Sequence, residues 1–153
     1  MASLNWGSAT HAGQVRAQNE DNLVAVDGVY VVADGMGGHE AGEVASQIAV
    51  ERIRADLDID GLPEASTVVN SISNANGDIF RAAIANPGQA GMGTTVTAIA
   101  VIGDKLAGRG APNLDVNDDG KMTPIMAAEP SEALVLANVG DSRTYLLRHG
   151  RLR

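Results

Sequence analysis

The sequence predicts an α+β protein that folds as a single domain. Two apolar, β-rich runs, 23–26 and 29–33, are separated by Asp27-Gly28, a dipeptide typical of β-hairpins. Two stretches with helical periodicity follow, and strand-like patterns return from residue 91 onward. A length of 153 residues allows one domain with a substantial core.

The composition excludes several classes of function. Hydrophobic residues make up 44% of the chain and aromatic residues only 3%, which together predict a globular fold with a closely packed aliphatic core. The net charge of −8 argues against a nucleic-acid or anionic-membrane surface. The chain has no cysteine, so thiolate chemistry is excluded. We expect a cytoplasmic protein with neither a cleaved leader nor a membrane helix, because both need apolar runs that are not found here.

The residues before the hairpin carry a group of charges. A first strand is predicted over 3–12, with His11 as a surface residue near its end. Arg16 follows, four residues before Glu20 and five before Asp21. An arginine this close to two acids has two readings: it neutralises them, or it presents its guanidinium group to a phosphate beside a metal ion.

The two-residue hairpin turn, which suits type I′ geometry, predicts a cluster of carboxylates. A hairpin returns its second strand beside its first, so Glu20 and Asp21 should lie next to Asp34. Three carboxylates repel one another unless a cation lies among them or some stay protonated. Ligands that are all oxygen favour Mg²⁺, Mn²⁺ or Ca²⁺ over zinc. The glycine-rich turn 35–38 either lets main-chain groups approach an ion or phosphate, or is a plain turn.

Two helices are predicted next, over about 40–57 and about 63–85. The apolar face of the first consists of Val44, Ile48, Ile53 and Leu57. The apolar face of the second consists of Val68, Val69, Ile72, Ile79, Ala83 and Ile84. Gly77 lies inside the second helix and costs ~1 kcal/mol relative to alanine, so a break at this residue is the alternative.

The remaining chain is predicted to contain strands around a long inserted loop. A strand over 91–103 precedes the loop 103–132, and strands over 133–137 and 144–147 follow it, with a turn at His149-Gly150. Within the loop, Asp115 to Asp119 resemble the start of an EF-hand calcium loop. The glutamate expected at its twelfth position is Met126, so calcium binding competes with a solvated hairpin loop.

Four stretches together resemble the metal-dependent serine/threonine protein phosphatases of type 2C, in the form found in the bacterial branch. They are GQVRAQNEDN (13–22), VVADGMGGHEAGEVAS (31–46), GMGTTVTAI (91–99) and LANVGDSRTYLLRHGRL (136–152). They occur in the family's order and cover most of the chain. The resemblance implies an αββα sandwich, in which two antiparallel sheets are flanked by helices and the metal site lies at one end between the sheets.

The resemblance also implies a set of metal ligands. Asp34 matches the acid that bridges two metal ions, and Gly35 matches the residue whose carbonyl binds one of them. Glu20 and Asp21 match acids that hold metal-bound waters, and Asp141 matches an acid associated with a third metal in bacterial members. The implied cofactors are two or three Mn²⁺ or Mg²⁺ ions.

Other matching residues are assigned by the same resemblance. Arg16 matches the arginine that binds the substrate phosphate, so Arg16 and Asp34 are the implied catalytic residues. Met36 stands where animal members carry a histidine proposed as general acid, and His39 is expected to face solvent at a helix start. Structural roles are expected for Thr94, Thr95, Asn138 and Arg143.

The implied reaction is the hydrolysis of phosphoserine and phosphothreonine in proteins by a metal-activated water. The implied partners are phosphorylated proteins, as substrates of bacterial serine/threonine kinases or as stress-response regulators. Family members continue with further strands and helices that carry two more metal-binding aspartates, so 1–153 corresponds to roughly the first three-fifths of a catalytic domain.

Three explanations of this difference stay open. The chain is a piece of a larger enzyme, or it assembles with a second chain or exchanges strands with a copy of itself. Alternatively, it is an inactive homologue that binds phosphoprotein or metal ions without turnover.

Overall fold

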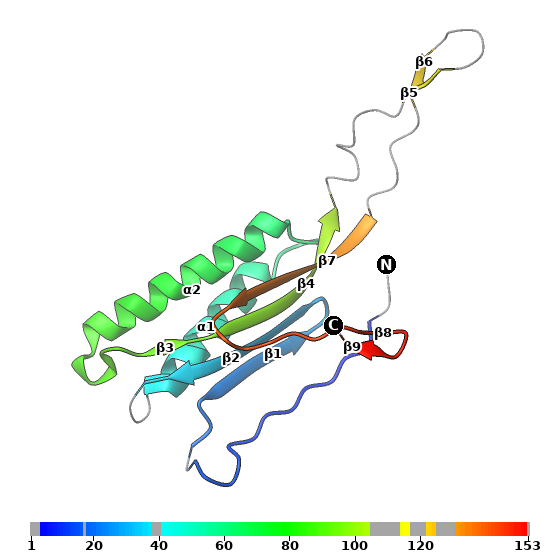
Figure 1. The fold of residues 1–153 in the computed structure, drawn as a ribbon. Coiled ribbons are helices and arrows are strands. Elements are labelled where there is room, and N and C mark those ends of the chain that lie inside the picture. The colour runs from blue at the N-terminus through cyan, green and yellow to red at the C-terminus, as the bar shows by residue number, and fades with distance from the viewer. Residues whose placement is uncertain are drawn as a thin grey trace.

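The computed structural model describes residues 4–16, 18–37, 41–104, 114–116, 122–124 and 131–152. They form an α+β fold, as the sequence predicts, in which two helices cover one face of an antiparallel sheet (Figure 1). A second, two-stranded antiparallel sheet is formed by residues near the C-terminus. The helix layer and the main sheet are successive layers of the sandwich architecture that the resemblance implies.

The main sheet has the strand order β1 (Asp21–Val26), β2 (Val29–Met36), β4 (Val96–Asp104) and β7 (Ser131–Val139). The short strand β3 (Gly93–Thr94) pairs with the last two residues of β2. The strand predicted over 91–103 is therefore divided into two pieces. The division falls where the backbone and side chain of the intervening threonine bond to β2 instead of continuing the ladder.

The hairpin of β1 and β2 is confirmed, but its turn is not of type I′. That turn needs a positive φ at both central residues, and here Gly28 has φ 79° whereas Asp27 does not have a positive φ. The carbonyl of Gly28 accepts a hydrogen bond from the N–H of Val101 at 2.8 Å, so the neighbouring strand fixes this peptide. A positive φ at both central residues, which a type I′ turn needs, occurs instead at His149 and Gly150, with φ of 51° and 71°.

The helices α1 (Ala41–Leu57) and α2 (Ala65–Ala85) match the predicted spans, and α2 continues through Gly77 without a break. A short 3₁₀ helix, η1 (Pro87–Gln89), follows α2. Of the predicted apolar face of α1, Ile53 and Leu57 are buried, whereas Val44 and Ile48 are only half-buried.

The predicted apolar face of α2 is only partly correct. Val68 is 1% exposed, but Val69 is 63% exposed and Ile84 is 70% exposed. α2 packs mainly against α1 and touches β4 and β7 only lightly, so just one side of its apolar surface finds a partner.

The core lies between α1 and the sheet and is aliphatic, as the composition predicts. Small side chains let the helix approach the sheet closely, since Ala33, Ala45 and Ala49 are completely buried. The main cluster consists of Val29, Val31, Ala33, Ala49, Val50, Ile53, Leu57, Val68, Ala75, Val96, Ala98 and Ala100.

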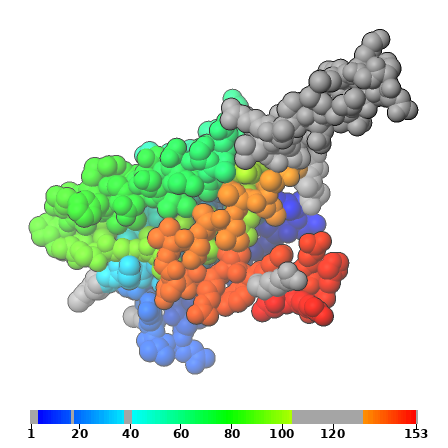
Figure 2. Space-filling view, turned by 45° about the horizontal axis from the view of Figure 1, so that its top comes forward, coloured from blue at the N-terminus to red at the C-terminus, as the bar shows by residue number. Residues whose placement is uncertain are grey.

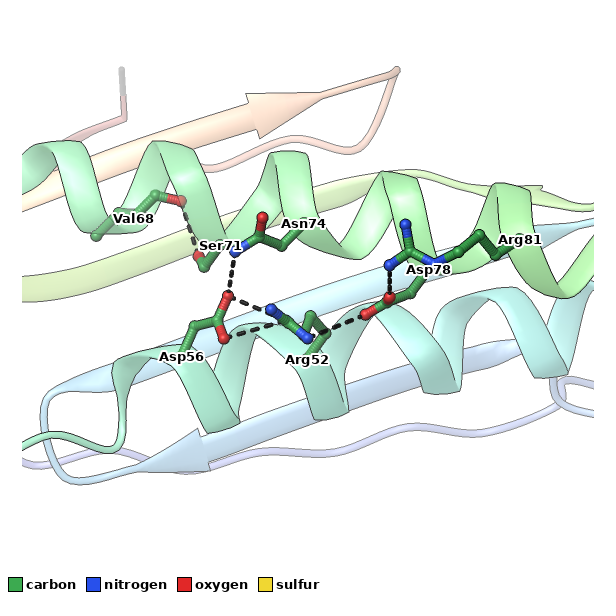
Figure 3. A network of polar contacts seen from close by, with 7 residues as sticks. All are labelled: Arg52, Asp56, Val68, Ser71, Asn74, Asp78 and Arg81. Atoms are coloured by element: carbon green, nitrogen blue, oxygen red, sulfur yellow. Dashed lines mark hydrogen bonds and ion pairs between the residues drawn. The ribbon is translucent and has the colours of Figure 1, made fainter.

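A polar network joins the two helices at their surface (Figure 3). Arg52 lies between two acids, with its Nε 3.0 Å from Asp56 Oδ1 and its Nη1 3.4 Å from Asp78 Oδ2. Asn74 of α2 donates a hydrogen bond to Asp56 Oδ2 at 2.8 Å, and Arg81 pairs with Asp78. The network therefore fixes the register of α1 against α2.

The face of the sheet away from the helices is apolar and partly exposed. Val32 and Leu134 are exposed there, and the N-terminal residues run across it, with the ring centroids of Trp6 and Tyr30 6.1 Å apart. A hollow of about 470 Å³ lies between the N-terminal residues and this face of the sheet. The strand predicted over 3–12 is wrong for the described residues 4–12, because a strand needs a backbone partner and no described residue pairs with them.

The stretch after β7 also crosses this face. The hydroxyl groups of Thr97 and Thr144 lie 2.7 Å apart, which places the chain over β4 rather than beside a sheet edge. The strand predicted over 144–147 is therefore wrong for residues 144–146, and pairing begins at β8 (Leu147–Arg148), which forms a hairpin with β9 (Arg151–Leu152).

Within the predicted loop 103–132 the structure describes two short strands, β5 (Leu114–Val116) and β6 (Met122–Pro124), which pair antiparallel. Residues 117–119 of the predicted calcium loop lie outside the described residues, and so does His39. In the described part of the chain, neither helix is apolar enough over sufficient length to cross a membrane.

Candidate functional site

Two of the predicted site residues, Asp21 and Asp34, meet at one end of the sheet. The register of β1 and β2 places them directly opposite each other. In β2, Val29, Val31 and Ala33 are buried against the helices, so the alternating Asp34 side chain lies on the other face.

The electrostatics of this pair are unfavourable in the absence of a cation. The pKa of Asp21 is raised from its ordinary value of 3.8 by burial, then by the charge of Asp34 and a hydrogen bond to its side chain. Glu20 raises this pKa further, while Arg16 lowers it. A neighbouring negative charge disfavours the ionised form of a carboxyl group, so the raised pKa is the expected response of an acid placed beside a second acid.

The carboxylate of Glu20 bonds to Arg16. Its Oε2 accepts a hydrogen bond from Arg16 Nη1 at 3.0 Å, and the side chains are 19% and 63% exposed, respectively. The ion pair expected of the neutralising reading of Arg16 is therefore present. Because the Arg16 side chain is largely exposed, phosphate binding by Arg16 stays a prediction.

The described residues contain no group of three or more His, Asp or Glu side chains placed to hold a metal ion. The predicted convergence of three carboxylates is thus seen for the two aspartates, while the Glu20 carboxylate bonds to Arg16. The donor set nevertheless fits a hard divalent cation, because it consists of carboxylate oxygens and because such a cation would relieve the repulsion at Asp21.

The glycine that follows Asp34 permits the close contacts of this region. Gly35 donates its N–H to the carbonyl of Glu20 at 3.1 Å. A Cβ atom on Gly35 would lie 2.0 Å from the carbonyl oxygen of Gly42 and 2.6 Å from that of Glu20. The end of β2, the entry to β1 and the first turn of α1 are therefore in direct contact, as expected of a turn that needs glycine.

Ser46 and Asn22 hold the start of β1 against α1, and neither residue was identified from the sequence. Ser46, completely buried in α1, donates its hydroxyl to the carbonyl of Glu20 at 2.6 Å and accepts a hydrogen bond from Asn22 Nδ2 at 2.9 Å. These contacts bind the start of β1 to the helix. No local pattern marks them, because Ser46 and Glu20 are 26 residues apart.

Thr94 and Thr95 hold the backbone of Asp34, in line with the structural roles expected of them. The hydroxyl of Thr94 donates to the Asp34 carbonyl at 3.0 Å. The Thr95 N–H donates to the same carbonyl at 2.9 Å, and the Thr95 hydroxyl accepts a hydrogen bond from the Asp34 N–H at 3.2 Å. The aspartate is thus fixed from both sides of its peptide unit.

Asp141 lies at the same end of the sheet and is exposed. Its neighbour Ser142 has its hydroxyl 2.6 Å from that of Thr95, so the turn after β7 is anchored to the residue that holds Asp34. Asn138 donates its side-chain amide to the carbonyl of Gly140 at 3.2 Å, which stabilises the turn.

The comparisons with known proteins agree with one another, although no protein-family model matches the chain. The serine/threonine protein phosphatase PstP of Mycobacterium tuberculosis is 34% identical over 151 residues, which cover 97% of this chain and 24% of PstP. The serine/threonine phosphatase stp of Listeria welshimeri is 34% identical over 155 residues, which cover 94% of this chain and 50% of stp.

A solved structure shows the same fold. The catalytic domain of PstP in complex with two manganese ions superimposes with a TM-score of 0.64 at 36% identity, over 92% of this chain and 49% of that one. The chain therefore spans about half the length of this structure, and half or less of the two phosphatases named above.

Proposed function

We propose a function that proceeds from family membership: this chain belongs to the type 2C, or PPM, family of serine/threonine protein phosphatases. We propose that it provides the metal-binding carboxylates and the phosphate-binding arginine for hydrolysis of phosphoserine and phosphothreonine in proteins. The observation that carries the proposal is the Asp21–Asp34 contact, in which two acids are held together at a cost.

The residues proposed to hold Mn²⁺ or Mg²⁺ are Asp34, the carbonyl of Gly35, and Glu20, Asp21 and Asp141. When bound, such ions would supply an acidic water and neutralise charge on the phosphate. The protein's own contribution is to keep the carboxylates in place. The backbone bonds of Asp34, and the hydroxyl that Ser46 donates to Glu20, serve that purpose.

Arg16 is proposed to bind the substrate phosphate. A guanidinium group has five N–H donors, and one of those of Arg16 is used by Glu20. The others are available to phosphate oxygens because the side chain is largely exposed. The proposed partners are phosphorylated proteins of bacterial kinase and stress-response signalling.

The alternative is a protein that binds metal or phosphoprotein without turnover. It is favoured by the ion pair of Glu20 with Arg16, which engages one of the three carboxylates that the sequence predicts to meet. The two functions make the same prediction for metal binding and opposite predictions for hydrolysis.

The first test is metal binding by the full chain, measured as a thermal shift and by calorimetry. We expect Mn²⁺ to raise Tm by at least about 3 °C, which corresponds to roughly 1 kcal/mol for a domain of this size. Asp34→Ala should abolish this shift. The matched control is Asp60→Asn, which changes an exposed loop acid and should leave the shift intact.

The second test is turnover of p-nitrophenyl phosphate and of a phosphothreonine peptide with Mn²⁺. Release of phosphate that disappears in Asp34→Ala supports the phosphatase. A thermal shift without any phosphate release supports the binding protein. If Mn²⁺ produces no shift at all, the phosphatase and the metal-binding form of the alternative are both wrong for this chain.

A further inference from the structure

The charges of this protein are unevenly distributed along the chain. Residues 142–153 contain four of its eleven lysines and arginines and none of its nineteen acidic residues. The rest of the chain carries nineteen acidic residues against seven basic ones. A basic segment on an otherwise acidic protein indicates a local binding surface rather than a general attraction for anions.

The β8–β9 hairpin places two of these arginines opposite each other. Arg148 and Arg151 are paired across the two strands and flank the turn residues His149 and Gly150. Opposite residues of an antiparallel pair have Cβ atoms about 4.5–5.5 Å apart, so both guanidinium groups can reach one anionic group.

This pair has no acidic partner in the described part of the chain. The ion pairs seen there join Arg16, Arg52 and Arg81 to neighbouring carboxylates, and none involves Arg148 or Arg151. Both side chains are exposed. Like charges directly opposite each other destabilise a strand pair, so the arginines do not serve the hairpin's own stability.

The other pair of the hairpin, Leu147 and Leu152, belongs to the opposite face of the two strands. The face of the hairpin that carries Arg148 and Arg151 therefore does not carry the two leucines. The structure describes two residue pairs in this hairpin, and a ligand that bridges both arginines would neutralise their repulsion and hold the two strands together.

The hairpin lies apart from the candidate metal site. Figure 1 shows β8 and β9 near the end of the sheet where β1 ends and β2 begins, whereas Asp34 is close to the other end of β2. In Figure 2 the C-terminal residues form a corner of the molecular surface. A ligand of the arginine pair is therefore not the phosphate that is proposed to bind near Asp34.

We propose that Arg148 and Arg151 form a docking surface for an acidic segment of a protein partner. The carboxylates of an acidic polypeptide suit two guanidinium groups at this spacing, since each carboxylate can accept two parallel N–H hydrogen bonds from one guanidinium group. A nucleic acid or an anionic membrane fits less well, because the acidic remainder of the chain would repel an extended array of phosphates. That the partner is a phosphoprotein substrate rests on the proposed function, whereas the docking itself does not.

The test is fluorescence anisotropy of the full chain with a fluorescein-labelled glutamate-rich peptide and its glutamine-substituted twin. The chain should bind the glutamate-rich peptide and not the twin, and binding should weaken with added salt. The double variant Arg148→Gln/Arg151→Gln should bind on the order of tenfold more weakly, as expected for the loss of two exposed ion pairs.

The matched control is Arg54→Gln/Arg81→Gln, which removes the same charge from exposed positions of the two helices. It should bind as the unaltered chain does. Circular dichroism melts of both variants establish that they are folded, and the hairpin variant should be no less stable because its like-charge pair is gone.

Equal losses in the two double variants would overturn the proposal, because they would show a response to net charge alone. Equal binding of the glutamate-rich peptide and its glutamine twin would also overturn the proposal. So would binding to poly(U) or to phosphatidylserine vesicles that is tighter than binding to the glutamate-rich peptide. The Mn²⁺ thermal shift is measured on the same samples. A chain that binds the peptide through the arginines but shows no Mn²⁺ shift would refute the proposed function and leave the docking surface standing.

Discussion

Asp21 and Asp34 lie directly opposite each other on adjacent strands, and burial together with the charge of Asp34 raises the pKa of Asp21. The sheet forces this contact, since the register of the hairpin is set by the apolar residues that follow Asp21 and precede Asp34. The fold therefore holds two acids together that would separate in the unfolded chain. Its consequences can be measured without any substrate.

The first prediction concerns the pH dependence of stability in the absence of divalent ions. Because the pKa of Asp21 is raised on folding, the folded state holds more protons than the unfolded state between the ordinary value of 3.8 and the raised value. The contribution of Asp21 to the free energy of unfolding should fall as pH rises through that window. Urea denaturation at a series of pH values with a chelator measures it.

The variant Asp21→Asn isolates this contribution. This substitution should remove the part of the pH-dependent fall in the free energy of unfolding that is due to Asp21. At neutral pH it should also stabilise the metal-free chain by about 0.2–1 kcal/mol, as for relief of a like-charge pair. Asp60→Asn, in an exposed loop, should follow the unaltered chain. If the Asp21→Asn curve runs parallel to that of the unaltered chain, Asp21 and Asp34 do not interact as the structure shows.

The second prediction compares two completely buried serines. Ser46→Ala removes the hydrogen bonds that join α1 to the Glu20 carbonyl and to the Asn22 amide through one buried hydroxyl, so it should cost about 1–3 kcal/mol. Ser71 donates only to the Val68 carbonyl of its own helix, at 2.8 Å, so Ser71→Ala should change stability by less than about 0.5 kcal/mol. Chemical denaturation provides both values.

A further consequence separates Ser46 from a purely structural serine. If its contact with Glu20 positions the carboxylates, Ser46→Ala should also weaken the response to Mn²⁺ at temperatures where the variant is folded. Ser71→Ala should leave that response unchanged. Identical stability losses in the two variants would contradict the different environments of the two hydroxyl groups.

The third prediction concerns Gly35. A Cβ atom there would collide with two backbone carbonyl oxygens, which cannot move as a flexible side chain would. Gly35→Ala should therefore destabilise the chain by more than about 3 kcal/mol. Gly88→Ala is the control, because no atom lies within 4 Å of its Cβ position, and it should be neutral or slightly stabilising. Thermal melts of the two variants are sufficient to compare them.

The fourth prediction concerns the network between α1 and α2. Arg52→Gln should cost about 0.5–1 kcal/mol, since Arg52 bridges Asp56 and Asp78 at a half-exposed position. The difference should shrink at high salt because the lost interactions are screened. Arg54→Gln, on an exposed face of the same helix, should have almost no effect. A loss that does not depend on salt would indicate packing rather than charge.

The sequence was sufficient to predict features that depend on neighbouring residues. The hairpin follows from two apolar runs around Asp27-Gly28, and the helices follow from their periodicity, with ends within two residues of those observed. The contact of Asp21 with Asp34 also follows from the hairpin, because a tight turn leaves no other register. The fold class could therefore be predicted before any tertiary contact was known.

Other features depend on which surfaces meet. The exposure of Val69 and Ile84 reflects the light packing of α2 on the sheet, which the helical pattern does not reveal. The negative φ of Asp27 accompanies a hydrogen bond between the turn and β4, a partner more than seventy residues away. The lack of a strand over the described residues 4–12 follows from the lack of a paired backbone among the described residues.

The sequence by itself determined the fold class, the helices, the first hairpin and the acids that the hairpin brings together. Those depend on local periodicity and on turn chemistry, which short segments encode. Only the tertiary structure decided that Ser46 and Thr95 hold the site from distant elements. Such contacts arise from packing between segments far apart in the chain, where several partners compete for each polar group.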